Sequence, residues 1–124
     1  MCLLDDEIFE CEINWADSMN MTVLMLACSL PDNLHMVRDL LSFGANPQTF
    51  DMLGRTPLHF ATEVGTLDVI KLLVLSAKVP VDIHGPDLNW TPLLTAVVNE
   101  RWESVELLSA LAIATKSKPN TFSV

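Results

Sequence analysis

The chain has 124 residues, of which half are apolar, and a formal net charge of −9. This length suits one domain with a modest core, and the apolar content argues against a disordered chain. The seven basic residues are scattered, whereas a surface that binds nucleic-acid phosphate needs clustered Lys and Arg. No apolar run reaches the roughly 18 residues that a membrane helix requires, so we expect neither a nucleic-acid partner nor a membrane.

Three cysteines, Cys2, Cys11 and Cys28, stand at irregular spacing and form no CxxC pair. An odd number without metal-ligand spacing is a poor disulfide framework and a poor zinc site. The first residues also lack the basic and apolar regions of a secretory signal. Free thiols suit a reducing compartment, so the sequence predicts a cytoplasmic or nuclear protein with no metal and no cofactor.

The N-terminal region comes first in the chain and is rich in carboxylates, five of which lie in residues 1–12. It is too short for a complete unit of the repeat described below. We interpret residues 1–16 as a degenerate N-terminal cap.

A pattern of Thr, with Leu two residues later and Ala five residues later, occurs in residues 17–27, 51–61 and 86–96. The three Thr residues stand at positions 22, 56 and 91, so the spacings are 56 − 22 = 34 and 91 − 56 = 35. A recurring spacing of this length is typical of repeat proteins, in which each unit stacks on its neighbours.

Each stretch precedes a segment whose apolar residues recur with the 3.6-residue period of an amphipathic helix. These segments are residues 34–41, 67–73 and 102–108. Each unit is therefore predicted to consist of a turn, a short helix, a loop and a longer helix. The predicted boundaries are 17–50, 51–85 and 86–115, with a flexible tail at 116–124, all within a single domain spanning 1–124.

The second copy reads Thr-Pro-Leu-His-Phe-Ala at residues 56–61, which matches the T-P-L-H-x-A signature of ankyrin repeats. The first copy departs from the signature at Val23 and Met25, and the third departs at Leu94. The sequence resembles the ankyrin-repeat family over residues 13–111. The resemblance implies an all-α solenoid of about three helix-loop-helix repeats with protruding finger loops.

The family period is 33 residues, so the observed spacings of 34 and 35 contain one and two extra residues. We place one insertion near residues 29–33, between two helices, and the other near residues 78–85, before the third unit. Backbone extension costs little in such loops.

Stacking of the units predicts two apolar layers, because a single helix pair cannot bury its own apolar face. One layer should contain Leu24, Leu58 and Leu93 with Ala27, Ala61 and Ala96, and the other Leu40, Leu41, Leu72, Leu73, Leu107 and Leu108. Trp102 is expected to face the core.

His59 invites a catalytic interpretation, yet no Ser, Cys or acid stands at a recognisable spacing from it. Catalysis needs such a positioned partner. Motifs for metal, dinucleotide or nucleotide phosphate are also missing from the sequence. We therefore expect no enzyme, and the resemblance implies that His59 ties adjacent finger loops through hydrogen bonds to the backbone.

In ankyrin repeats a partner usually docks on the finger loops and the inner surface of the short helices. In this chain those positions are unusually apolar, and large exposed apolar patches mark interaction sites. The predicted partner-binding residues are Met19, Met21, Phe50, Met52, Leu53, Arg55, Glu63, Val64, Leu88, Trp90 and Val98. The alternative is that Phe50 and Trp90 pack back on neighbouring fingers and only stiffen the array.

The sequence thus predicts a protein–protein interaction module, a scaffold or adaptor. A second hypothesis is an inhibitor or targeting subunit of a kinase or transcription factor. A third is that the apolar fingers contact further repeats of a longer chain or a second copy. The sequence does not choose among these partners.

Overall fold

A computed structural model describes residues 13–85 and 90–116. Most of the predicted N-terminal cap, the tip of the third finger with Leu88, and residues 117–124 lie outside the described residues.

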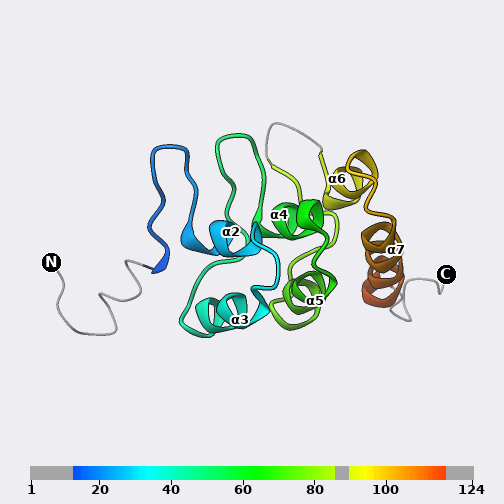
Figure 1. Cartoon of the computed structure of the whole chain (residues 1–124), viewed down its shortest axis with the longest axis horizontal. Helices are drawn as coiled ribbons and strands as arrows, with labels where there is room; N and C mark the ends of the chain where they lie inside the picture. Colours follow the sequence, from blue (N-terminus) through cyan, green and yellow to red (C-terminus); the bar gives the residue numbers. More distant parts are fainter. Residues whose placement is uncertain (1–12, 86–89, 117–124) are drawn as a thin grey trace, which may run out of the picture.

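The described chain forms three helix pairs that stack in a row (Figure 1). Helix α2 (Val23–Cys28) pairs with α3 (Leu34–Ser42), and α4 (Pro57–Val64) pairs with α5 (Leu67–Lys71), which η1 (Leu72–Ser76) continues. The last pair is α6 (Pro92–Val98) and α7 (Trp102–Lys116). The short helices α2, α4 and α6 form one layer, the longer helices form the other, and finger loops protrude beyond the short helices (Figure 1). The predicted all-α solenoid is therefore confirmed.

The repeated Thr is the N-cap of each short helix. The Oγ1 atoms of Thr22, Thr56 and Thr91 each accept a hydrogen bond from the backbone N–H three residues later, at 3.3–3.4 Å. Such a cap satisfies a donor that the first helical turn leaves without a partner. The Pro after Thr56 and after Thr91 fits the first helical position, where no backbone donor is needed.

The first extra residue lies where it was predicted, in the loop between α2 and α3. From Thr22 to Leu34 there are 34 − 22 = 12 steps, and from Thr56 to Leu67 there are 67 − 56 = 11. The longer loop turns through Asp32, whose φ is +55°.

The prediction for the second repeat was only half right, because one of its two extra residues lies inside the helix. Leu34 to Gly44 is 44 − 34 = 10 steps, whereas Leu67 to Lys78 is 78 − 67 = 11; Gly44 and Lys78 both turn the chain with positive φ. The additional residue is absorbed by the π-helical turn η1, in which the N–H of Ala77 bonds to the carbonyl five residues earlier at 3.1 Å. The other extra residue follows Lys78.

The two apolar layers are largely as predicted. Leu24 and Leu58 are at most 1% exposed, and Ala27, Ala61 and Ala96 let the short helices approach closely. In the second layer Leu40, Leu73 and Leu108 are buried, while Leu41, Leu72 and Leu107 are half-buried against them.

Two core predictions are wrong, and both concern the last repeat. Leu93 is 38% exposed and Trp102 is 57% exposed. Both lie on α6 and α7, and no helix in the described part of the chain packs on the far side of this pair (Figure 1). The helix α7 also reaches Lys116, the first residue of the predicted tail.

Replacing Leu58 by Ala should lower the free energy of unfolding by about 2–5 kcal/mol, because the side chain is fully buried on α4, the short helix that packs between α2 and α6. Urea unfolding followed by circular dichroism measures the loss. The matched control is Ile113→Ala on α7, where the side chain is 70% exposed and the change should stay within about 0.5 kcal/mol. Equal losses in both variants would contradict the stacked core.

Candidate functional site: the finger surface

The second finger is held in shape by one carboxylate. Asp51 Oδ1 accepts hydrogen bonds from the backbone N–H of Leu53 at 2.9 Å and of Arg55 at 2.8 Å. Backbone bonds between Asp51 and Arg55 and between Gly54 and Asp51 close the turn, and Gly54 takes a φ of +81°, which suits glycine. The buried Asp51 therefore fixes the finger from within, and the side chains at its tip remain free.

The first finger repeats this arrangement. Asp17 Oδ1 accepts from the backbone N–H of Met19 at 2.9 Å and of Met21 at 2.8 Å. Asn20 replaces glycine at the left-handed position, with a φ of +65°, a conformation that Asn tolerates better than most residues. Both fingers are thus Asp-centred turns of the same geometry.

Neighbouring fingers are joined through their backbones. The N–H of Met52 donates to the carbonyl of Met19 at 3.0 Å, and Asn20 Nδ2 donates to the carbonyl of Phe50 at 2.9 Å. The third finger approaches the second so closely that a Cβ on Gly85 would lie 2.8 Å from the Gly54 Cα atom. The fingers therefore form one surface.

Three apolar side chains project from this joined pair of fingers. Met19 is 51% exposed, Met52 is 65% and Leu53 is 60%. Together with Trp90, which is 41% exposed at the base of the third finger, we call them the finger surface. Exposed apolar groups held on a fixed backbone are the arrangement expected of a binding surface.

Two predicted binding residues at the base of the second finger, Phe50 and Arg55, make contacts within the protein. Arg55 Nε donates to Asp51 Oδ2 at 2.9 Å, and its guanidinium lies 4.7 Å from the centre of the Phe60 ring. Phe50 is half-buried against the core. Phe50 and Arg55 therefore have structural roles, and their contact with a partner stays a prediction.

Trp90 is both held within the array and exposed to a partner, the two alternatives considered for it from the sequence. Its Nε1 donates to Thr95 Oγ1 at 2.9 Å, which fixes the ring on α6, yet much of its surface stays exposed. Its backbone carbonyl lies 2.7 Å from His59 Nε2.

His59 ties the third finger to the second repeat, as the resemblance implied. Its Nδ1 accepts from the backbone N–H of Thr56 at 3.1 Å, so the ring proton is on Nε2 and is donated to the Trp90 carbonyl. This assignment requires a neutral imidazole, because a proton on Nδ1 would oppose the Thr56 donor. Burial lowers the pKa of His59, against the opposing effects of the Trp90 carbonyl and Asp51.

The remaining predicted residues differ in exposure. Met21 is half-buried against the core and Val64 is half-buried, whereas Glu63 is exposed and Val98 is 62% exposed. Leu88 lies outside the described residues. The structure therefore joins Met19, Met52 and Leu53 at the finger tips and places Val98 away from them on α6.

Sequence reasoning missed two groups of residues. The carboxylates of Asp17 and Asp51 shape the fingers, and their signal was a fixed place in the repeat: 22 − 17 = 5 and 56 − 51 = 5 residues before the capping Thr. Val23 and Leu26 expose an apolar face of α2, at 41% and 52%. Their three-residue spacing was the signal for this face.

No three His, Cys, Asp or Glu side chains converge as metal ligands within residues 13–85 and 90–116. No helix in that part of the chain has the length and apolar character to cross a bilayer.

Acidification should destabilise the protein through His59. The ordinary pKa of histidine is about 6.5, and the pKa of His59 in the folded state lies below this value. As the pH falls through the window between these two pKa values, the unfolded chain binds a proton at this histidine and the folded chain does not. The contribution of neutral His59 to the free energy of unfolding is complete above about pH 6.5 and is lost below it. The free energy of unfolding changes by at most about 1.4 kcal/mol per pH unit through this residue.

Urea unfolding of wild type and His59→Gln at pH 7 and pH 5 gives the slope of the free energy of unfolding against pH for each protein. We expect a smaller slope in His59→Gln. The control is His35→Gln, because His35 is exposed on α3 and should leave the slope unchanged. An unchanged slope in His59→Gln would show that His59 is protonated alike in both states.

Comparison with known proteins agrees with the repeat pattern. A sequence model of a family described as Ankyrin repeats (3 copies) matches residues 1–84 and, in a second register, residues 24–120.

Several much longer proteins contain similar segments. Tyrosine-protein kinase HTK16 of Hydra vulgaris is 28% identical over 106 residues, 86% of this chain and 14% of the kinase. NF-kappa-B inhibitor delta of Mus musculus is 38% identical over 78 residues, 62% of this chain and 23% of that protein. Neurogenic locus notch homolog protein 4 of Homo sapiens is 44% identical over 59 residues, 48% of this chain and 3% of that protein.

The chain thus spans less than a quarter of each of these relatives. The family model covers nearly the whole sequence, and the stacked helix pairs with Thr caps and Asp-centred fingers agree with it. On these grounds the chain belongs to the ankyrin-repeat family.

Proposed function

We propose that this protein binds another protein through the finger surface. The observation that carries the proposal is that Met19, Met52 and Leu53 are exposed side by side on two fingers whose backbones are bonded to each other. Ankyrin repeats generally mediate protein–protein interaction, which supports this reading of the site.

The rigid backbone of the fingers favours binding in energetic terms. Ordering a loop at an interface costs free energy, and here the Asp17 and Asp51 carboxylates have already ordered the turns. Methionine adapts its shape to a partner, and tryptophan is frequent at binding hot spots. We therefore assign the main apolar contacts to Met19, Met52, Leu53 and Trp90.

The negative charge of this chain favours a partner with basic residues around its binding site. The chain carries a formal net charge of −9, which speeds encounter with a positively charged surface. The partner should present an apolar anchor flanked by Lys or Arg. This role requires neither catalysis nor a cofactor, and we place the protein in the cytoplasm or nucleus.

A second candidate is an inhibitor or targeting subunit. The likeness to NF-kappa-B inhibitor delta, at 38% identity over 78 residues, favours it. It uses the same finger surface, and the two roles differ in the result of binding. Added protein that changes the activity of its partner supports an inhibitor, whereas a change of location alone supports an adaptor.

Further repeats of a longer chain are another candidate partner, at a different surface. Leu93, Leu94 and Val97 are 38–42% exposed on α6, at positions where Leu58, His59 and Thr62 of α4 are buried by the next repeat. This face has the chemistry of a repeat-to-repeat contact.

Charge at the finger tips should abolish partner binding. The double variant Met52→Asp, Leu53→Asp places two carboxylates at the centre of the proposed contact, and each should cost at least the roughly 1.4 kcal/mol that makes a tenfold change in affinity. Affinity capture from lysate, followed by titration of the purified partner, measures the loss.

The matched control is Met36→Asp, Ile113→Asp, two exposed apolar residues on the longer helices at 49% and 70% exposure. Circular dichroism checks that both double variants are folded. Retention of the partner by the control and its loss by the finger variant is the expected result. Wild-type affinity in the finger variant would place the binding site elsewhere.

A further inference from the structure

Each repeat has a loop between its short helix and its long helix, at the end of the short helix that lies away from the finger. Asp32, Gly65 and Glu100 turn these three loops, with φ values of +55°, +87° and +56°. A positive φ suits glycine, and few other residues adopt it readily. The carboxylates of Asp32 and Glu100 are therefore not required by the turns that they occupy.

Two hollows lie between these loops, one between each neighbouring pair. The first has a volume of about 360 Å³ and is lined by residues 32–34 of one loop and residues 65–69 of the next. The second has a volume of about 400 Å³ and is lined by Gly65 and residues 100–104. Gly65 lines both, so the hollows adjoin on either side of one loop. We call these lining residues together the loop edge.

Carboxylates outnumber cations along the loop edge. Asp32 and Asp68 line the first hollow, and Glu100 and Glu103 line the second. All four are exposed, and none of them forms an ion pair with a described residue. Arg101 also lines the second hollow, where its Nε donates to a backbone carbonyl of α4 at 3.0 Å. The lining thus has a net charge of 1 − 4 = −3.

The second hollow has two further groups suited to a cationic side chain. Ser104 lines it and is only 1% exposed, yet its Oγ has no hydrogen-bond partner among the described residues. A buried hydroxyl without a partner is destabilising, and an N–H group of Lys or Arg that enters the hollow would supply a donor. Trp102 also lines the hollow and is 57% exposed, and the face of a Trp ring attracts a cation.

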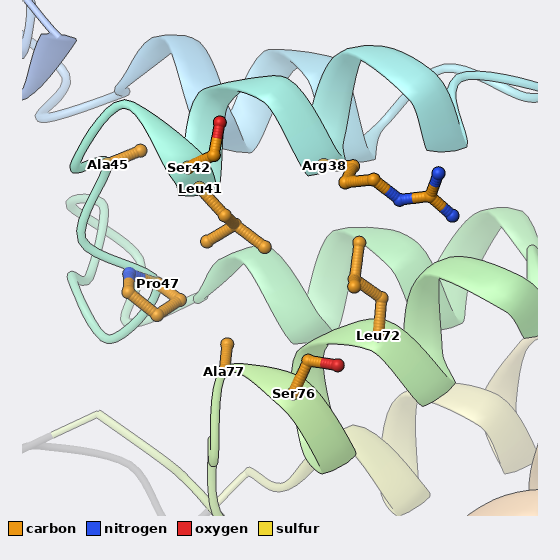
Figure 2. A pocket seen from close by; sticks show the side chains of 8 residues that line it. All are labelled: Arg38, Leu41, Ser42, Ala45, Pro47, Leu72, Ser76 and Ala77. Atoms are coloured by element: carbon orange, nitrogen blue, oxygen red, sulfur yellow. The ribbon is translucent and has the colours of Figure 1, made fainter.

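The outer layer has a groove of the opposite charge. It lies between α3 and the helix formed by α5 and η1, and Leu41 and Leu72 point into its volume of about 520 Å³ from two sides (Figure 2). Arg38 lines this groove, and Lys71 lines a neighbouring hollow of about 270 Å³ together with Asp68. Neither cation forms an ion pair with a described residue. The groove therefore repels a basic segment that the loop edge attracts.

We propose that the loop edge binds a basic segment of a partner protein, with one Lys or Arg side chain in each hollow. The inference does not depend on the finger surface, because no residue of that surface lines either hollow. Opposite charge draws the segment to this edge, and the Ser104 hydroxyl and the Trp102 ring add contacts in the second hollow.

The repeat also sets the spacing of the two basic residues. The hollows belong to successive pairs of loops, and neighbouring packed helices lie ~8–10 Å apart. In a polyproline II segment, side chains three residues apart lie on the same side and are separated by ~9 Å. The segment that fits therefore has Lys or Arg at positions i and i+3.

An NMR titration of the full chain with two synthetic peptides tests the proposal. Acetyl-Lys-Pro-Pro-Lys-amide has the fitting spacing, and its isomer acetyl-Lys-Lys-Pro-Pro-amide has the same charge and composition. The first peptide should shift the amide signals of Gly65 and Ser104 and the indole signal of Trp102, and leave the methyl signals of Leu41 unchanged. The isomer should bind about fivefold more weakly, because it fills one hollow at a time. Equal affinities, or shifts at Leu41 instead of Gly65, would overturn the proposal.

Two double variants separate local charge from net charge. Asp32→Gly, Glu100→Gly removes one carboxylate from each hollow, and glycine suits the positive φ at both positions, so the fold is retained. Asp39→Asn, Glu106→Gln removes two exposed carboxylates from α3 and α7 outside the hollows. The first variant should bind the fitting peptide about fivefold more weakly. The second should change the affinity by less than about twofold at 0.15 M salt, which screens distant charges. Equal weakening in both would show that net charge alone attracts the peptide.

Discussion

Each helix pair of this protein leaves one apolar face uncovered, and only a neighbouring pair can cover it. This constraint explains why Leu24 and Leu58 are at most 1% exposed while Leu93, at the same place in the last repeat, is 38% exposed. The difference arises from position in the row and not from side-chain chemistry. The small Ala61 and Ala96 serve the same constraint, because they allow the short helices to approach. Stability is therefore shared between repeats, and α6, at one end of the described row, leaves Leu93, Leu94 and Val97 exposed.

The fingers depend on a second set of interactions, in which side chains satisfy backbone donors and acceptors. Asp51 orders one finger internally, and His59 joins the next finger to the helix beneath it. Met52 and Leu53 take part in these bonds only through their backbone N–H groups, so their exposed side chains are not needed to form the finger. The fold can therefore keep its finger geometry while the chemistry of the tips varies, which is the property that a binding surface requires.

Much of this architecture could be predicted from the sequence, because the Thr-to-Ala pattern reports local capping and packing. The errors arose where position in three dimensions decides the outcome. Trp102 has the spacing of a core residue, but exposure depends on whether another repeat follows. The extra residue in η1 could not be located, because a helix with a π turn keeps the same apolar composition as one without it. At the site, apolar tips were found from composition, whereas the roles of Phe50 and Arg55 depend on contacts with Phe60 and the core that no local pattern reveals.

The two layers of the solenoid differ in local charge. The finger layer exposes apolar tips in a chain of formal net charge −9. The outer layer has a groove lined by the cations Arg38 and Lys71. The extra residue of the π turn shapes this groove by placing Ser76 and Ala77 on the side of Leu72, and π turns often occur at functional sites.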